Sequence, residues 1–201
     1  MTKAAPRINT VNMERLLEQI IAEGKRHQQE WWGVVTLDPD NPAPVLYEDS
    51  WGDAQFGVTC PTAACAAGWM CFIAGDTGVA DAGSPIGPTA WAKLTKDGVL
   101  SEAPVRTLSL TRVIPAGQTL VSENTVSIES RAKSLLGLSH HQGSILFEAL
   151  NTRAFVQSTL RRTIVHAKRH PDARILVAAN GAHHDPVQWA HQCGYCVRHG
   201  A

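Results

Sequence analysis

Three of the five cysteines lie close together in the stretch Cys60–Cys71. Pro61 suits the first turn of a helix, and only Gly68 interrupts the helical stretch that it would open. A thiolate near the N-terminus of a helix is stabilised by the helix dipole, and the thiolate is the nucleophilic form of cysteine. Cys60 and Cys65 are therefore the candidate nucleophiles of this chain.

A cysteine nucleophile needs a histidine as general base and a third group that orients the histidine ring. The candidates for the base are His166, His183, His184 and His191, and those for the orienting group are Asp185 and Asn180. No spacing fixes which of them meets a cysteine, and the protease signature Cys-Gly-Ser-Cys-Trp is absent. The catalytic candidates are thus Cys65, Cys60 and His166. The competing interpretation, which the sequence favours, is that the thiols are buried and inert.

A second group of ligand-type residues lies near the C-terminus, where Cys193 and Cys196 form a Cys-x-x-Cys pair. Such a pair in a tight turn can direct two thiolates at one zinc ion, which normally takes four ligands. Closing the site with both His191 and His199 would be crowded, so His183 or His184 is a better third ligand. The candidate metal ligands are Cys193, Cys196, His184 and His191. The cofactor prediction is zinc or none, since a metal-free tail accounts for the same residues.

Residues 131–146 have the pattern of a helix-turn-helix, in which the second helix begins with the sequence His-His-Gln. These side chains could hydrogen-bond to the edges of bases. Only two cations, Arg131 and Lys133, lie nearby, and core packing of a helical hairpin is the competing interpretation. The next helix carries basic residues that could bind phosphate or form a solvated face, namely Arg153, Arg161, Arg162, Lys168 and Arg169.

Helical spacing of apolar residues predicts most of the elements that would hold these groups. The first helix spans residues 11–29 with Asn12 as N-cap, and Pro61 opens the central helix. Three more helices cover residues 126–168. Gly137 is predicted to end the first of these three helices. Ser139, with Gln142 as its capping-box partner, is predicted to begin the second, and Asn151 or Thr152 the third.

The other stretches show little helical periodicity. Residues 75–90 are rich in Gly and Pro and predict a loop, within an insertion that spans residues 76–125. Short elements are expected at Val45–Tyr47 (strand), Trp91–Leu94 (helix) and Leu108–Val113 (strand), with a turn at Ala116–Gln118. The prediction is a mainly α, single helical domain over residues 1–201, with a Gly/Pro-rich insertion and a possible small β-hairpin. Residues 1–10 would form a flexible arm and residues 181–201 a His/Cys-rich tail.

Composition limits the function classes. The formal net charge is zero, with 18 basic and 18 acidic residues, and 44% of the residues are hydrophobic. No excess of positive charge indicates nucleic acid or an anionic membrane as partner. The N-terminus lacks the apolar core of a signal peptide, and no apolar run approaches the about 20 residues needed to cross a bilayer. The expected location is the cytoplasm, where thiols stay reduced.

Two parts of the chain carry a recognisable motif. The first contains Cys60, Thr62, Cys65, Ala67, Gly68 and Trp69, and the second contains Leu135-Leu136-Gly137-Leu138, Gln142 and Leu146-Phe147; Trp51-Gly52 fits upstream. They resemble a family of small proteins found mainly in actinobacteriophages and some bacteria. The motif of that family is Cys-Gly-Thr-x-x-Cys-x-Ala-Gly-Trp, followed by Leu-Leu-Gly-Leu and Leu-Phe. The chain departs from it at Pro61, where the family usually has Gly.

The resemblance covers roughly half of the chain and implies fold and origin, since the family has no established activity. It predicts a phage-type accessory protein in the cytoplasm of the host cell that binds a host or phage macromolecule. A protein partner is expected, nucleic acid is a second option, and no membrane contact or oligomeric state is predicted. Whether the protein is an enzyme stays open, although no catalytic set is complete. The alternatives are a Cys-His hydrolase or transferase, a helix-turn-helix nucleic-acid binder and a small structural-zinc protein.

Overall fold

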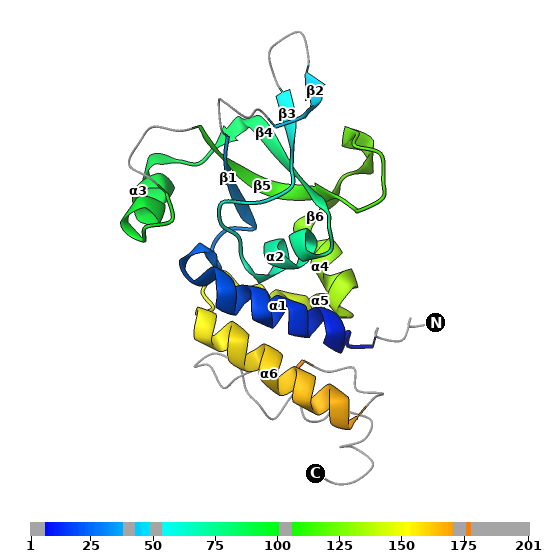
Figure 1. Cartoon of the computed structure of the whole chain (residues 1–201). Helices are drawn as coiled ribbons and strands as arrows, with labels where there is room; N and C mark the ends of the chain where they lie inside the picture. Colours follow the sequence, from blue (N-terminus) through cyan, green and yellow to red (C-terminus); the bar gives the residue numbers. More distant parts are fainter. Residues whose placement is uncertain (1–6, 38–42, 49–53, 101–105, 171–175, 178–201) are drawn as a thin grey trace.

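The computed structural model describes residues 7–37, 43–48, 54–100, 106–170 and 176–177. Six strands form an antiparallel sheet, in the order β1-β5-β4-β3-β2 with β6 also pairing to β5. The strands are β1 (Gly33–Thr36), β2 (Val45–Glu48), β3 (Ala54–Val58), β4 (Thr77–Pro85), β5 (Thr107–Ile114) and β6 (Val126–Ser127). The prediction of a mainly α-helical domain is wrong, because this sheet makes up one part of the fold; helices α2 and α4 contact it, and α1 and α6 pack on helices (Figure 1).

The helices form the rest of the structure. They are α1 (Thr10–Glu23), α2 (Ala66–Ile73), α3 (Pro88–Lys96), α4 (Ile128–Leu136), α5 (His140–Leu146) and α6 (Arg153–Arg169), with 3-10 turns η1 (Gly24–Arg26) and η2 (Ser122–Asn124). Helix α2 packs against α4 and the sheet, and α1 packs on α2 and on α6 (Figure 1). A single cluster of buried apolar side chains joins these helices to strands β1, β3, β4 and β5.

The segment that was predicted as an insertion supplies the middle of the sheet. Strand β4 occupies most of the predicted 75–90 loop and pairs with β3 on one side and β5 on the other. Its sequence, Thr-Gly-Val-Ala-Asp-Ala-Gly-Ser-Pro, has few of the branched and aromatic residues that favour strands. At Gly78 a Cβ atom would lie 2.9 Å from the Phe72 ring of α2, so the close approach of that helix excludes a side chain there. Tertiary packing therefore overrides local preference.

The helix boundaries in the last third of the described chain are confirmed. Gly137 ends α4 in the left-handed conformation with φ 67°, a conformation that glycine adopts without strain. Ser139 and Gln142 form a reciprocal capping box at α5, and Thr152 caps α6. The short elements at Val45–Tyr47, Trp91–Leu94 and Leu108–Val113 are confirmed within β2, α3 and β5.

The N-terminal boundaries of two helices are wrong. Asn9, not Asn12, caps α1, and the Asn12 amide donates instead to the Leu135 carbonyl at 2.8 Å. The central helix begins at Ala66 rather than at Pro61. Residues 62–64 are extended because their backbone pairs with residues 26–34, through bonds such as Thr62 N to Val34 O at 2.7 Å.

Candidate functional site

The Cys65 thiol lies inside the core. Cys65 is the N-cap residue of α2, is 1% exposed, and donates its S–H to the Trp32 carbonyl at 4.0 Å. Burial raises the pKa of Cys65 to about 11, although backbone N–H groups led by that of Gly68 act in the opposite direction. The side chain is therefore a neutral thiol at physiological pH, and a neutral, inaccessible thiol is a poor nucleophile.

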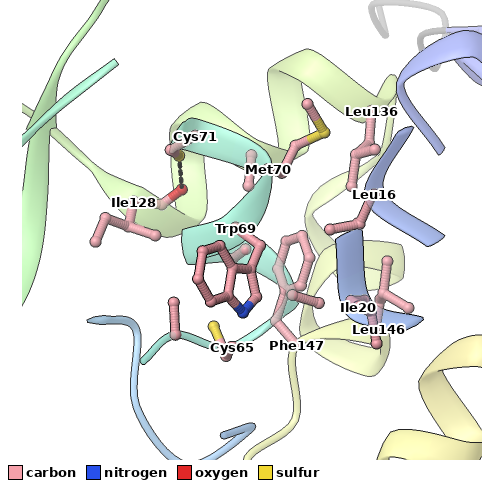
Figure 2. Close-up of a cluster of buried hydrophobic side chains, with 14 of the residues drawn as sticks. Leu16, Ile20, Cys65, Trp69, Met70, Cys71, Ile128, Leu136, Leu146 and Phe147 are labelled. Atoms are coloured by element: carbon pink, nitrogen blue, oxygen red, sulfur yellow. Dashed lines mark hydrogen bonds between the residues drawn. The ribbon is translucent and has the colours of Figure 1, made fainter. Parts of the chain in front are cut away.

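Cys71 behaves in the same way. Its thiol is buried on α2 and donates to the Ile128 carbonyl at 3.6 Å (Figure 2). The pKa of Cys71 is raised, mainly by burial and to a smaller extent by the negative charge of Asp76. Figure 2 shows the α2 side chains Cys65, Trp69, Met70 and Cys71 among side chains from α1, α4 and α5. The stretch that attracts attention by its cysteines is thus the packing centre of the molecule.

Gly68 explains how tightly this centre is packed. A Cβ atom at Gly68 would lie 1.9 Å from the Trp32 carbonyl oxygen and 2.8 Å from the Ala64 methyl group. The neighbour that approaches this face of the helix is the backbone of the segment before β1. The same Trp32 carbonyl accepts a hydrogen bond from the Cys65 S–H, so Gly68 and Cys65 both contact the backbone of Trp32.

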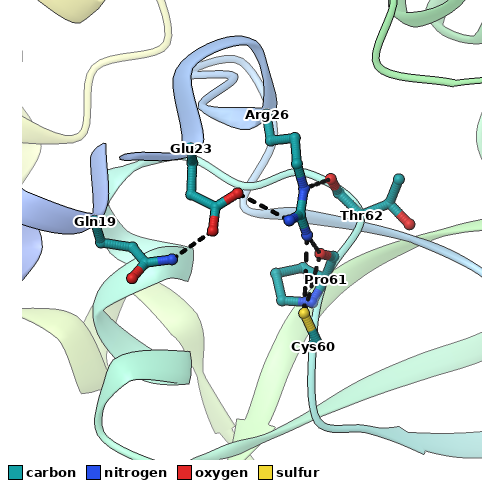
Figure 3. A network of polar contacts seen from close by, with 6 residues as sticks. All are labelled: Gln19, Glu23, Arg26, Cys60, Pro61 and Thr62. Atoms are coloured by element: carbon teal, nitrogen blue, oxygen red, sulfur yellow. Dashed lines mark hydrogen bonds and ion pairs between the residues drawn. The ribbon is translucent and has the colours of Figure 1, made fainter. Parts of the chain in front are cut away.

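Cys60 differs from the other two described cysteines because it is exposed. Figure 3 shows Arg26 beside it, with Nη2 at 3.8 Å from the Cys60 sulfur. The main partners of Arg26 are backbone carbonyls, those of Thr62 at 2.8 Å and Pro61 at 2.6 Å, and the carboxylate of Glu23 at 2.9 Å. The guanidinium also lies 5.4 Å from the centre of the Trp69 ring. Through these hydrogen bonds, Arg26 stabilises the turn before α2.

The structure does not bring the third catalytic candidate to the cysteines. His166 lies on α6, and α1 stands between α6 and α2 (Figure 1). Its ring centre is 4.8 Å from that of His170, and its Nε2 atom is buried without a hydrogen-bond partner among the described residues. The pKa of His166 is lowered, mainly by burial and to a smaller extent by the charge of the neighbouring His170. No hydrogen bond links this ring to Cys60 or Cys65 within the described structure.

The other histidine candidates and the predicted zinc ligands lie outside the described residues, so the metal prediction stays a prediction. They are His183, His184, His191, Cys193 and Cys196, together with the orienting candidates Asn180 and Asp185. Within the described ranges, no group of three or more His, Cys, Asp or Glu side chains is arranged to hold a metal ion. In the same part of the chain, no helix is both long and apolar enough to cross a bilayer.

The helical hairpin α4–α5 uses its polar residues within the fold. Gln142 is 4% exposed and its amide oxygen accepts from the Ser139 backbone N–H at 2.8 Å. Arg131 donates to Asp76 at 2.9 Å and 3.1 Å, and the Lys133 ammonium contacts Glu129 at 3.0 Å. Each of the two cations that support a helix-turn-helix interpretation therefore has an intramolecular carboxylate partner.

The pair formed by Asp76 and Arg131 was not anticipated. The Asp76 side chain is fully buried at the end of α2 and also accepts from the Ala116 N–H at 2.9 Å. Its hydrogen bonds raise the pKa of Arg131, so the guanidinium stays charged. Asp76 lies in a Gly/Pro-rich stretch typical of a solvated loop, and no residue pattern there indicates a buried carboxylate.

The outer side of α6 has a different character. A hollow of about 390 Å³ lies there, and we call it the α6 groove; its lining residues are Arg161, Arg162, Val165, His166, Arg169, His170 and Val177. Val177 forms one wall, and its N–H donates to the Thr163 hydroxyl at 2.9 Å. Among the described residues, no carboxylate lines the groove, so its described charged groups have one sign.

The arginines of the α6 groove have no ion-pair partner among the described residues. Within the described part of the chain, Arg161, Arg162 and Arg169 are exposed and take part in no ion pair. Lys168, on the same helix but outside the groove, is paired with Glu14 of α1. The sequence did point to this helix as a possible phosphate contact, but it could not separate the paired cation from the unpaired ones.

The comparisons with known proteins add no relative. The resemblance to the actinobacteriophage family stays a prediction, carried by the residues quoted for it. No protein-family model matches the chain, no curated protein is significantly similar to it, and no solved structure matches it.

Proposed function

We propose that this protein is a non-enzymatic binding protein that holds an anionic macromolecule in the α6 groove. One observation carries the proposal: within the described part of the chain, three arginines without an ion pair and two histidines line a hollow that has no carboxylate in its lining. Guanidinium groups that are free of internal partners can form bidentate hydrogen bonds to phosphate, sulfate or carboxylate groups. The resemblance to phage accessory proteins favours a host or phage macromolecule as the partner.

The alternative of a Cys-His hydrolase or transferase has less support. The buried neutral thiol of Cys65 and the position of His166 on the far side of α1 both argue against it. The exposed Cys60 has an arginine as its polar neighbour and no histidine in contact within the described residues.

The net charge makes a direct test possible. Because the formal charge of the chain is zero, retention on an anionic polymer at pH 7.5 has to come from a local patch. The test variant carries Arg161→Gln, Arg162→Gln and Arg169→Gln. The matched control removes three exposed cations elsewhere, through Arg15→Gln, Lys25→Gln and Lys96→Gln, and so has the same net charge.

We expect the wild-type protein and the control variant to bind immobilised heparin at low salt and to elute together in a salt gradient. The groove variant should flow through, while far-ultraviolet circular dichroism shows that its fold is intact. Failure of the wild-type protein to bind, or equal retention of the two variants, would reject the α6 groove as a binding site for anions.

A further inference from the structure

We infer that the anion taken by the α6 groove is the phosphate backbone of single-stranded nucleic acid. This inference rests on the proposed function and names the partner class of the same groove. It depends on three features of the groove: the kind and spacing of its cations, the planar and apolar groups between them, and its size.

The cations form a row along the helix. Arg161 and Arg169 are two positions of one helical ridge, eight residues apart, which is about 12 Å at about 1.5 Å per residue. A nucleic-acid strand carries roughly three phosphates over that length, at about 3.4 Å per phosphate in a stacked strand. All three unpaired cations are arginines, whose planar fork matches two phosphate oxygens, whereas lysine acts as a point charge.

Between these arginines the groove offers surfaces for bases. The His166 and His170 rings have centres 4.8 Å apart and are tilted by 52°, and the Val165 side chain is 49% exposed. Bases stack on planar side chains, including histidine, in proteins that bind single strands. The side chains of Asp and Glu carry no aromatic ring, so a poly-acidic peptide would use the arginines alone. The combination therefore favours a nucleic acid over an acidic protein.

The size of the groove favours a single strand over a duplex. Its volume of about 390 Å³ is near the lower limit of about 300 Å³ for pockets that enclose small molecules, so it suits one or two splayed-out bases. The wall formed by Val177 also lies along one side of α6. A helix that reads the major groove of duplex DNA needs its flanks free to enter that groove.

The test is a binding titration with the full chain and a fluorescein-labelled fifteen-nucleotide oligo-dT, followed by fluorescence anisotropy at pH 7.5. Three phosphate contacts predict that log K falls with log salt with a slope of about −2 for a single strand. We expect the groove variant, Arg161→Gln with Arg162→Gln and Arg169→Gln, to lose at least about tenfold in affinity at 50 mM salt and most of its salt dependence. The control variant, Arg15→Gln with Lys25→Gln and Lys96→Gln, should stay within about twofold.

Competition identifies the class of partner. Unlabelled oligo-dT should displace the probe at lower concentration than poly-glutamate or a duplex of equal length. If poly-glutamate binds the groove and oligo-dT does not, the nucleic-acid inference fails and the proposed function survives. If the duplex competes as well as the single strand, the preference for a single strand is wrong. If no polymer binds, or if binding is equal in both variants, the inference and the proposed function both fail.

Discussion

The stretch Cys60–Cys71 and the outer side of α6 both carry side chains capable of chemistry, and folding treats them in opposite ways. In the first, two thiols lie in the core, and each donates a hydrogen bond to a backbone carbonyl, Cys65 to that of Trp32 and Cys71 to that of Ile128. In the second, three guanidinium groups stay in solvent without a carboxylate partner among the described residues. The region with the rarer residue types is largely buried around α2, and the region with ordinary basic residues is the exposed surface that we propose as the binding site.

The polar groups of the two regions differ in whether they already have partners within the described fold. Cys65, Arg26 and Arg131 are chemically capable, but each has its partner inside the fold. Intramolecular hydrogen bonds to such groups contribute to the stability of the native state and would have to break before a ligand could use them. The following predictions test this difference between the two regions, from the largest effect to the smallest.

The largest difference should appear in thiol reactivity. In a background with Cys193→Ser and Cys196→Ser, Ellman's reagent should label Cys60 in the native protein. Cys65 and Cys71 should react at least about 10³-fold more slowly, because their exposure requires an opening that costs on the order of 5 kcal/mol. Peptide mass spectrometry of time points assigns each label. Rapid labelling of Cys65 would show that the stretch is accessible and would restore it as a catalytic candidate.

The next effect compares a paired arginine with an unpaired one. Arg131→Gln leaves the fully buried Asp76 carboxylate without its cation. Loss of one partner of a buried ion pair costs about 3–5 kcal/mol of unfolding free energy. Arg161→Gln, in the α6 groove, should change it by less than about 0.5 kcal/mol. Urea unfolding of the two variants measures both values. Equal destabilisation would contradict the expectation that the paired Arg131 contributes more to stability than the unpaired Arg161.

The packing of α2 should be almost as sensitive to one added methyl group. Gly68→Ala places a Cβ atom against the Trp32 carbonyl, which belongs to the backbone and cannot rotate away. Overpacking of this kind costs about 1–3 kcal/mol, and we expect the upper end of that range. Gly87→Ser is the control, since a Cβ atom there meets nothing within 4 Å and serine is favoured at this N-cap of α3. A neutral result for Gly68→Ala would contradict the close contact.

A smaller effect, dependent on pH, should come from a histidine in the packed region. His27 is 6% exposed, and neither ring nitrogen has a hydrogen-bond partner among the described residues. Burial, and after it the charge of Arg153, lowers the pKa of His27 to about 4. The native state therefore keeps the ring neutral while the unfolded chain protonates near pH 6.5, so stability is full above that pH and falls as the pH drops toward 4.

At about 1.4 kcal/mol per pH unit, this histidine should remove roughly 2 kcal/mol of unfolding free energy between pH 6.5 and pH 5. Urea titrations at several pH values should show a shallower pH dependence for His27→Gln than for the wild-type protein. Groups that titrate in both proteins cancel in that difference. Parallel curves would mean that the ring reaches water or a partner in the native state.

The parts of the fold that local rules determine are the parts that the sequence predicted. Gly137, Ser139 with Gln142, and Thr152 act through backbone geometry and hydrogen bonds within four residues, and their helices end or begin where expected. The strand at Leu108–Val113 also follows from its alternating apolar residues. Such signals need no knowledge of the rest of the molecule.

The sheet was missed because its stability is not local. Strand β4 is rich in glycine and alanine, and it becomes a strand because β3 and β5 supply partners on both sides. The start of α2 was missed for the same reason, since residues 62–64 use their backbone groups to pair with residues 26–34. The α6 groove depends on which lysine or arginine meets a carboxylate, which is a property of tertiary packing. The basic helix was visible in the sequence, but its unpaired arginines were not.

The register of β1 with β5 sets the order in which this chain can fold. Gly33 of β1 faces Leu110 of β5, far along the sequence, and the turn before α2 hydrogen-bonds to the β1 segment through Val34. During synthesis, β1 leaves the ribosome well before its partner strand, with one edge of its backbone unsatisfied. Long-range strand pairing slows folding relative to helical bundles of similar size. We therefore expect the helices to form early and the sheet to close last, with β1 as the segment most exposed to wrong pairing before it closes.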